Sequence, residues 1–306
     1  MKMKHRIAAG AMLAGGWLLG AASSWAQDYG DTPYVQTPQV VVDKMLEMAK
    51  VTSKDYLIDL GSGDGRLIIT AAKKYGARGF GVDLNRSLVT LSNRNAAKAG
   101  VANRAVFYER DLHETDITKA DVLTIYLLPE VNLMVRPRIL ALKPGTRLVS
   151  HDYGFGEWPP DVEIVMDAPG KPVGRDQKSK VMYWVVPSRV AGKWSWQHAI
   201  DGKPQTFELN IDQVFQKVSG TVSAGGRPAA IENAVLSGDA LRFEANVERG
   251  AARMRLAFNG KVINNAIEGE ARGLPGPAGA AAAWSASRTE LREPRFTDLK
   301  PMPMAR

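Results

Sequence analysis

Two aspartates and three glycines stand within one short stretch, residues 59–66, whose sequence is DLGSGDGR. Glycines at alternate positions, here Gly61, Gly63 and Gly65, let the backbone adopt conformations closed to other residues and let a ligand approach the main chain. An apolar run precedes the stretch, and residues 67–74 have helical composition. The glycines are therefore expected where a strand turns into a helix, whose free N–H groups suit a nucleotide-like ligand.

Two classes of ligand use such a turn, and the glycine spacing distinguishes them. The dinucleotide fingerprint is G-x-G-x-x-G, with an acidic residue about 20 positions later. Here the third glycine comes one place early, and Arg66 stands where the last fingerprint glycine would be. Asp59 and Asp64 put two carboxylates beside the turn, which favours a cationic sulfonium amino acid over a pyrophosphate. Asp83 ends a second apolar run, where an acid can accept hydrogen bonds from both ribose hydroxyls.

Five segments in order carry a family resemblance. They are residues 34–38 (YVQTP), 59–66 (DLGSGDGR), 81–85 (GVDLN), 110–112 (RDL) and 126–130 (YLLPE). With these motifs and gaps, residues 34–160 resemble a class I S-adenosylmethionine (SAM) dependent methyltransferase. Within that class they look most like the small seven-strand lysine methyltransferases of the ATP synthase c-subunit methyltransferase type. The resemblance implies an α/β fold, with a Rossmann-like methyltransferase sheet and helices on both faces.

The resemblance also implies site residues. The implied cofactor-binding set is Tyr34, Thr37, Asp59, Gly61, Ser62, Gly63, Asp64, Gly65, Asp83, Asn85, Asp111 and Leu112. Asp111 is expected to accept from the adenine amino group, and Leu112 to lie against the ring. Tyr126 and Glu130, at the expected carboxyl edge of the sheet, are placed to help an acceptor lysine lose its proton. No obligatory catalytic base and no metal site is predicted, and His151 is interpreted as a structural hydrogen-bonding residue.

The predicted activity is methyl transfer from SAM to a nucleophilic nitrogen, with a protein lysine as first choice of acceptor and another amine as the alternative. The reaction is a displacement at a carbon already activated by the sulfonium, so the enzyme mainly aligns donor and acceptor. A rival interpretation is an exported, non-catalytic binding module that retains the methyltransferase fold. A dehydrogenase is third, because the glycine spacing disfavours it.

Composition bounds these alternatives. The chain has 306 residues with 45% apolar content, enough for one large domain or two of ordinary size. Its formal charge of +8 includes Lys2, Lys4 and Arg6, and no regular interleaving of basic and aromatic residues appears, so nucleic acid is not an expected partner. The absence of cysteine excludes disulfides, thiolate metal sites and cysteine nucleophiles.

The first 26 residues predict export. A basic start is followed by an apolar run over residues 7–22, and Ser24-Trp25-Ala26 offers small residues at the positions a signal peptidase reads. Cleavage after Ala26 and a periplasmic location are expected. An uncleaved membrane anchor is the alternative. Either location conflicts with SAM as a cytosolic metabolite.

Three local expectations concern the methyltransferase part, predicted to span residues 27–189. A helix over residues 39–50 is expected to begin after an N-cap at Thr37-Pro38. A helix over residues 132–141 is expected to kink or break at Pro137. Residues 162–166 and 181–186 are expected to form an antiparallel hairpin that completes the sheet.

Near Pro187 the pattern changes from helical periodicity to short alternating segments separated by turns. Seven strands are predicted, at residues 206–211, 217–222, 231–236, 240–247, 252–258, 266–271 and 282–288. Strands at this spacing favour a small all-β antiparallel sandwich or barrel over residues 190–290, followed by a tail over 291–306. The segment resembles lipocalin-like modules by pattern only. Its ligand and the oligomeric state are left open, and a partner in the cell envelope is one alternative.

Overall fold

The computed structural model describes residues 34–200, 202–249, 252–274 and 281–296. The predicted signal peptide, residues 1–26, lies outside the described residues, as does the end of the predicted tail. Within the described ranges, no helix has the length and apolar character needed to cross a bilayer.

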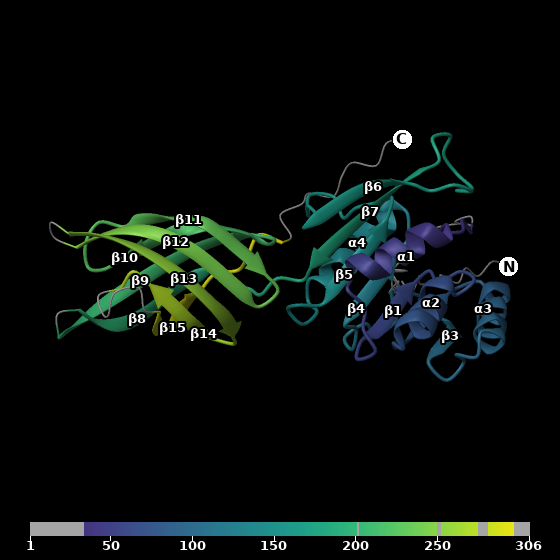
Figure 1. Ribbon diagram of the computed structural model, residues 1–306, viewed down its shortest axis with the longest axis horizontal. Helices are drawn as coiled ribbons and strands as arrows, with labels where there is room; N and C mark the ends of the chain where they lie inside the picture. The colour runs from purple at the N-terminus through teal and green to yellow at the C-terminus, as the bar shows by residue number, and fades with distance from the viewer. Residues whose placement is uncertain (1–33, 201, 250–251, 275–280, 297–306) are drawn as a thin grey trace, which may run out of the picture. The chain divides into compact units, whose positions relative to one another are not determined.

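One sheet of seven strands forms the first part of the fold, in the order β3-β2-β1-β4-β5-β7-β6 (Figure 1). Its strands are β1 (Tyr56–Leu60), β2 (Arg78–Asp83), β3 (Ala105–Glu109), β4 (Val122–Ile125), β5 (Arg147–His151), β6 (Val162–Asp167) and β7 (Lys178–Val185). The first five are parallel, and β7 pairs antiparallel with both β5 and β6. This confirms the Rossmann-like sheet and the closing hairpin. The strand order reverses between β1 and β4, the place where open α/β sheets bind ligands at their carboxyl edge.

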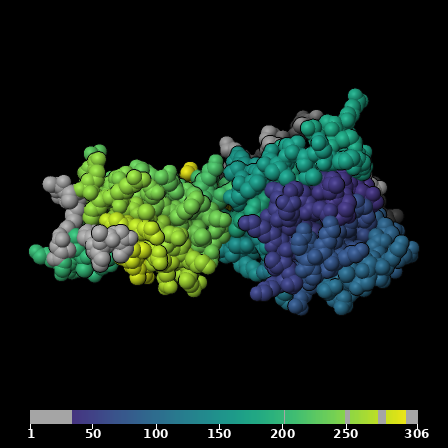
Figure 2. All heavy atoms as spheres, viewed as in Figure 1, coloured from purple at the N-terminus to yellow at the C-terminus, as the bar shows by residue number. Residues whose placement is uncertain are grey.

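Four helices cover the two faces of this sheet: α1 (Gln39–Met48), α2 (Arg66–Tyr75), α3 (Arg86–Lys98) and α4 (Pro129–Ile139). Residues of α1, α2 and α3 share one apolar core with Leu57 and Val122, while α4 packs with Ile58 and Leu123 on the other face. Neighbouring strand residues thus point to opposite cores, as the two-residue period of a strand requires. In Figure 2 the purple surface of α1 lies between the blue surface that follows it in the chain and the teal surface around β6 and β7.

The N-cap expectation in this part was wrong, and of the kink or break expected at Pro137 the break does not occur. Pro38, rather than a Thr37 side chain, occupies the N-cap position of α1, and no side chain caps the helix. The Thr37 hydroxyl instead contacts His151. Helix α4 starts with Pro129 in its first turn and continues through Pro137 without a break. Because Pro137 lies two residues before the end of the helix, little helix remains beyond it to be disrupted.

The second part of the fold is a closed antiparallel barrel, in the order β10-β11-β12-β13-β14-β15-β8-β9. Its strands are β8 (Gly192–Ile200), β9 (Lys203–Val214), β10 (Lys217–Ser223), β11 (Ala229–Ser237), β12 (Ala240–Arg249), β13 (Ala252–Ile263), β14 (Ala266–Arg272) and β15 (Ala282–Leu291). The prediction of seven strands missed β8, which closes the barrel by pairing with β15 and β9. Trp194 and Trp196 of β8 are buried in the barrel core, so this strand completes the interior as well as the hydrogen-bonded ring.

Candidate active site

The glycine turn joins β1 to α2. Gly61, Gly63 and Gly65 all have positive φ, at 76°, 54° and 83°. A Cβ on Gly65 would come within 2.6 Å of the Phe107 ring, and one on Gly61 within 2.7 Å of the Leu127 side chain. The turn therefore needs glycine both for its backbone conformation and for its close packing.

Asp83 ends β2 directly beside this turn. Its Oδ2 accepts the Gly63 N–H at 2.9 Å, and its Oδ1 accepts the Asn85 N–H at 2.9 Å. The carboxylate is half-buried, and each oxygen keeps a second lone pair for a ligand. Asn85 has a different contact, because its side-chain oxygen accepts the N–H groups of Ser87 and Leu88 and so caps α3.

Asp59 is buried at the end of β1. Thr124 of β4 donates its hydroxyl to Asp59 Oδ1 at 2.6 Å. Burial is the main reason that the pKa of Asp59 is raised to about 7, and the negative charges of Asp83 and Asp64 add to the effect, while the Thr124 hydrogen bond opposes it. Asp59 is thus a proton-binding group beneath the turn at neutral pH.

Asp64 pairs with Arg66 across the beginning of α2, with 2.5 Å between Asp64 Oδ2 and Arg66 Nη2. The same guanidinium donates through Nη1 to the carbonyl of Thr37 at 2.6 Å. These contacts attach the segment before α1 to the glycine turn. Ser62 lies in the same turn, and its buried hydroxyl has no hydrogen-bond partner among the described residues.

Asp111, Leu112 and Tyr34 are the remaining predicted cofactor residues. Asp111 and Leu112 follow β3 at the same sheet edge, with Asp111 Oδ1 accepting the His113 N–H at 2.7 Å and Leu112 packed partly against the core. Tyr34 is 41% exposed. The ends of β1, β2 and β3 thus carry the predicted cofactor residues other than Tyr34 and Thr37, which precede α1, and Thr37 contacts His151 at the end of β5.

A second group of polar side chains gathers at the ends of β4 and β5. Tyr126 directly follows β4, and its ring lies 4.0 Å from the ring of His151, centroid to centroid. The Tyr126 hydroxyl donates to Asp152 Oδ2 at 3.3 Å. Burial, and then the charge of Asp152, raises the pKa of Tyr126 above its usual value. The phenol therefore stays protonated at neutral pH and acts as a hydrogen-bonding group, not as a phenolate base.

His151 ends β5 and is fully buried. Its Nδ1 shares a hydrogen bond of 3.2 Å with Thr37 Oγ1, and its Nε2 one of 2.8 Å with Ser179 Oγ. Burial lowers the pKa of His151, against the opposing effect of Asp152, so the imidazole is neutral near pH 7. These contacts agree with the structural role predicted for it. Glu130, the other residue expected on the acceptor side, is exposed in the first turn of α4.

Sequence reasoning missed Asp152 and Lys171. Lys171 Nζ lies 2.7 Å from Asp152 Oδ2, and both side chains are largely shielded from solvent. The loop over residues 170–180 is polar and basic in composition, which is typical of a solvated connector and gives no sign of a shielded ion pair. Asp152 did offer one signal, since it is an acid directly after a buried strand at the expected carboxyl edge.

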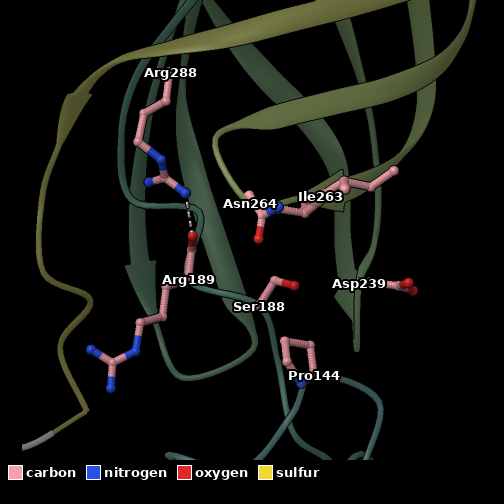
Figure 3. A pocket seen from close by; sticks show the side chains of 8 residues that line it. Pro144, Ser188, Arg189, Asp239, Ile263, Asn264 and Arg288 are labelled. Atoms are coloured by element: carbon pink, nitrogen blue, oxygen red, sulfur yellow. Dashed lines mark hydrogen bonds between the residues drawn. The ribbon is translucent and has the colours of Figure 1, made fainter.

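A pocket of about 510 Å³ is lined by Pro144, by the segment before β8 and by residues of the barrel strands and their turns (Figure 3). Its lining includes Ser188, Asp239, Asn264 and Arg288, and Arg288 donates to the carbonyl of Arg189 at 2.6 Å. No residue of the glycine turn lines it. This pocket is therefore separate from the candidate active site.

Comparison with known proteins decides the family. The model of the ANTKMT methyltransferase domain matches residues 59–162. A protein-lysine N-methyltransferase of Saccharolobus islandicus is 45% identical over 137 residues, which are 44% of this chain and 85% of that protein. The chain belongs to the class I SAM-dependent methyltransferases. It is related to the lysine N-methyltransferases of the ATP synthase c-subunit, of which the mouse protein is 32% identical over 130 residues, 42% of this chain and 52% of that protein.

A solved structure is also similar to this methyltransferase. It is described as an RNA methyltransferase of Salinibacter ruber in complex with S-adenosyl-L-homocysteine. The two proteins share 45% sequence identity, the TM-score is 0.46, and the match covers 51% of this chain and 96% of that one.

SAM is the cofactor of this methyltransferase, and the residues present fit it. Leu127 and Phe107 fill the space beside Gly61 and Gly65, so protein packing holds the glycine turn in its positive-φ conformation, and the Ser62 hydroxyl within the turn has no hydrogen-bond partner among the described residues. Asp83 has free lone pairs at the turn for ribose hydroxyls. SAM supplies a methyl group on a sulfonium, and the negative charge of Asp83 at this edge is electrostatically favourable for that cation.

Proposed function

We propose that this methyltransferase modifies the side-chain amine of lysine in a protein. The names of the Saccharolobus and mouse relatives support a lysine acceptor. The observation that carries the proposal is the position of Tyr126 and Asp152 at the ends of β4 and β5, next to the glycine turn, where Leu127 packs against Gly61. A cationic side chain reaching this edge meets a carboxylate and a phenol.

Each side chain at this edge has one role in the proposed reaction. Asp83 binds the ribose hydroxyls, and Asp111 with Leu112 holds the adenine. Asp59 and Asp64 hold the glycine turn in place, Asp59 through its bond with Thr124 and Asp64 through its pair with Arg66. Tyr126 orients the acceptor nitrogen through its hydroxyl and, being protonated, does not take its proton. The acceptor must lose that proton to become a nucleophile, and desolvation at the sheet edge lowers its pKa toward neutrality.

The non-catalytic binding module is the second candidate function. An exported chain with no supply of SAM would favour it. The glycine turn and Asp83, with the backbone contacts described above, count against it because they preserve a cofactor-binding geometry.

Methyl transfer to lysine is tested with purified protein, labelled SAM and three kinds of acceptor: an extract of cell-envelope proteins, a lysine-containing peptide and total RNA. We expect label in protein, and mass spectrometry should place the added methyl groups on lysine. Asp83→Ala is the inactive comparison. Label in RNA alone would replace the lysine proposal, and SAM binding without transfer to any acceptor would favour the binding module.

We also propose that the chain is exported to the periplasm, on the strength of the basic start, the apolar run and the small residues before position 27. Export would let the β-barrel part engage a partner in the cell envelope. Cell fractionation with intact-mass measurement tests this. A mature chain beginning at Gln27 in the periplasmic fraction is expected, and a chain beginning at Met1 in the cytoplasm would refute it.

A further inference from the structure

Asp152 is held in an unusual and well-defined position at the end of β5. Its φ of 59° lies in the left-handed region, which a non-glycine residue adopts at a cost unless its surroundings enforce it. The backbone N–H of Asp152 donates to the carbonyl of Lys180 at 2.8 Å, and the N–H of Lys180 donates back to Asp152 Oδ1 at 3.0 Å. These two bonds with β7 fix the carboxylate, and they leave Oδ2 to face other groups.

The group that Oδ2 binds in this structure is a lysine ammonium. Lys171 Nζ lies 2.7 Å from Asp152 Oδ2 and also donates to the carbonyl of Lys178 at 2.6 Å. Only 9% of the Lys171 side chain is exposed, although it comes from a loop whose neighbouring residues are exposed. A lysine from such a loop normally extends into water, because burying its ammonium requires a compensating partner. The structure therefore contains a place that accepts a lysine side chain.

Two chains of contacts connect this lysine-binding position at Asp152 to the predicted cofactor site. Tyr126, which shares Asp152 Oδ2 through its hydroxyl, is followed in the chain by Leu127, the side chain that packs on Gly61 of the glycine turn. His151, which precedes Asp152, shares a hydrogen bond with Thr37, and the Thr37 carbonyl accepts from Arg66 at the start of α2. The bound lysine thus lies on the acceptor side of the strand-order reversal between β1 and β4.

We propose that Asp152, together with the Tyr126 hydroxyl, receives the ammonium of the substrate lysine, and that Lys171 holds this place until the substrate displaces it. The inference rests on the lysine methyltransferase function proposed above. It assigns Asp152 as the residue that selects a cationic acceptor and Lys171 as an internal competitor.

The chemistry of the transfer is consistent with a carboxylate at this position. The substrate ammonium first releases one proton to water, a step that desolvation favours and the Asp152 carboxylate opposes. Its lone pair then forms the C–N bond while the C–S bond breaks and sulfur keeps the electron pair. Positive charge therefore moves from sulfur to nitrogen during the transfer. A fixed carboxylate beside the nitrogen stabilises that charge as it develops. The same carboxylate would not favour an uncharged acceptor in binding.

The decisive experiment compares KM for a lysine-containing peptide in the native protein, Lys171→Met and Lys171→Gln. Removing the internal ammonium leaves Asp152 free for the substrate, so we expect KM to fall about fivefold or more with kcat little changed. Lys171→Gln keeps a donor for the Lys178 carbonyl and removes only the charge, which guards against misfolding of the loop. An unchanged or increased KM in both variants would overturn the proposal, because Lys171 would then serve only to position Asp152.

Lys180→Met is the matched control. Its ammonium pairs with Glu163 at 3.2 Å and is 43% exposed, and only its backbone touches Asp152. The loss of one positive charge near the same loop should leave KM unchanged. A fall in KM equal to that of Lys171→Met would show a general charge effect and would also overturn the proposal.

Asp152→Asn tests the other half of the pair. It should raise KM for the peptide about tenfold or more, because a buried charge partner is removed, while calorimetry shows the same affinity for SAM.

The proposed function and the assignment of Asp152 and Lys171 would fail with different results. If the native protein methylates lysine but these variants do not shift KM as stated, only the assignment of Asp152 and Lys171 fails. If the native protein and Lys171→Met both bind SAM and neither methylates lysine, the proposed function fails and takes this inference with it.

Discussion

Thr37 and His151 share a buried hydrogen bond of 3.2 Å between Oγ1 and Nδ1, although 114 positions separate them in the chain. The carbonyl of Thr37 accepts from Arg66, which pairs with Asp64 of the glycine turn. The ring of His151 lies against that of Tyr126. One short segment before α1 therefore links the cofactor half of the sheet edge to the acceptor half.

We expect Thr37→Val to lower the free energy of unfolding by about 1 to 3 kcal/mol, because it leaves His151 Nδ1 buried without a partner. Urea unfolding measures this change. Thr37→Ser keeps the hydroxyl and removes one methyl group, so it should cost no more than about 0.8 kcal/mol. Equal losses in the two variants would mean that packing, and not the hydrogen bond, accounts for the effect.

Asp83→Ala should reduce the affinity for SAM by about tenfold or more, since hydrogen bonds to a charged acceptor contribute roughly 1.5 to 3 kcal/mol each. Isothermal calorimetry on the purified protein provides the dissociation constants. Glu130→Ala is the control, because Glu130 is exposed on the acceptor side and its removal should leave SAM affinity unchanged. An Asp83→Ala variant that binds SAM as tightly as the native protein would contradict the ribose role.

Gly65→Ala should destabilise the fold by roughly 2 to 4 kcal/mol. The new Cβ would meet the buried Phe107 ring at 2.6 Å and the Ser92 side chain at 2.8 Å, and the residue would keep a φ of 83°. Gly100→Ala separates these two costs, because Gly100 has a φ of 72° with nothing within 4 Å of its Cβ position. It should lose only about 1 to 2 kcal/mol in the same urea unfolding measurement. Similar losses at both positions would show that the turn tolerates a side chain.

The raised pKa of Asp59 predicts that the free energy of unfolding depends on pH. Between its ordinary pKa of 3.8 and its folded value of about 7, the folded protein keeps a proton that the unfolded chain has released. The contribution of this group to the unfolding free energy therefore falls as pH rises through that interval. Asp59→Asn cannot titrate, so it should remove this fall and stabilise the ligand-free protein above pH 7 by on the order of 4 kcal/mol. Parallel native and variant profiles in urea unfolding from about pH 4 to pH 8 would refute this.

The contribution of His151 to the unfolding free energy should change with pH in the opposite direction. Its pKa is lowered by burial, so below the ordinary value of 6.5 the unfolded chain takes up a proton that the folded protein excludes. The stability from the neutral imidazole is therefore present above that pH and is lost as the pH falls. His151→Gln should make the unfolding free energy less sensitive to acid over this range, which thermal unfolding at a series of pH values can follow. A variant more acid-sensitive than the native protein would contradict a buried neutral histidine.

Much of the sheet and the position of the glycine turn between β1 and α2 could be predicted from the sequence, because their signals are local. Strand β4 is buried along its whole length and is apolar apart from Thr124, and the glycine turn has positive φ at Gly61, Gly63 and Gly65. Asp83 was predicted to lie at the turn from its distance along the chain, and its carboxylate accepts the Gly63 N–H, while its role toward ribose stays a prediction. Local patterns of this kind depend on backbone geometry and strand burial, which neighbouring residues in the sequence largely determine.

Only the tertiary structure determined the acceptor half and the closure of the barrel. Lys171 belongs to a polar loop, and nothing in its own sequence neighbourhood predicts an ion pair with Asp152. Strand β8 shows its role only when β15 and β9 lie on its two sides. The hydroxyl of Thr37 had two uses available, a helix cap and a partner for His151, and the fold selected the second. These outcomes depend on contacts between segments that are distant in the sequence. Burial makes such contacts necessary, because a buried polar group needs a hydrogen-bond partner, and burial also shifts the pKa values of buried titratable groups.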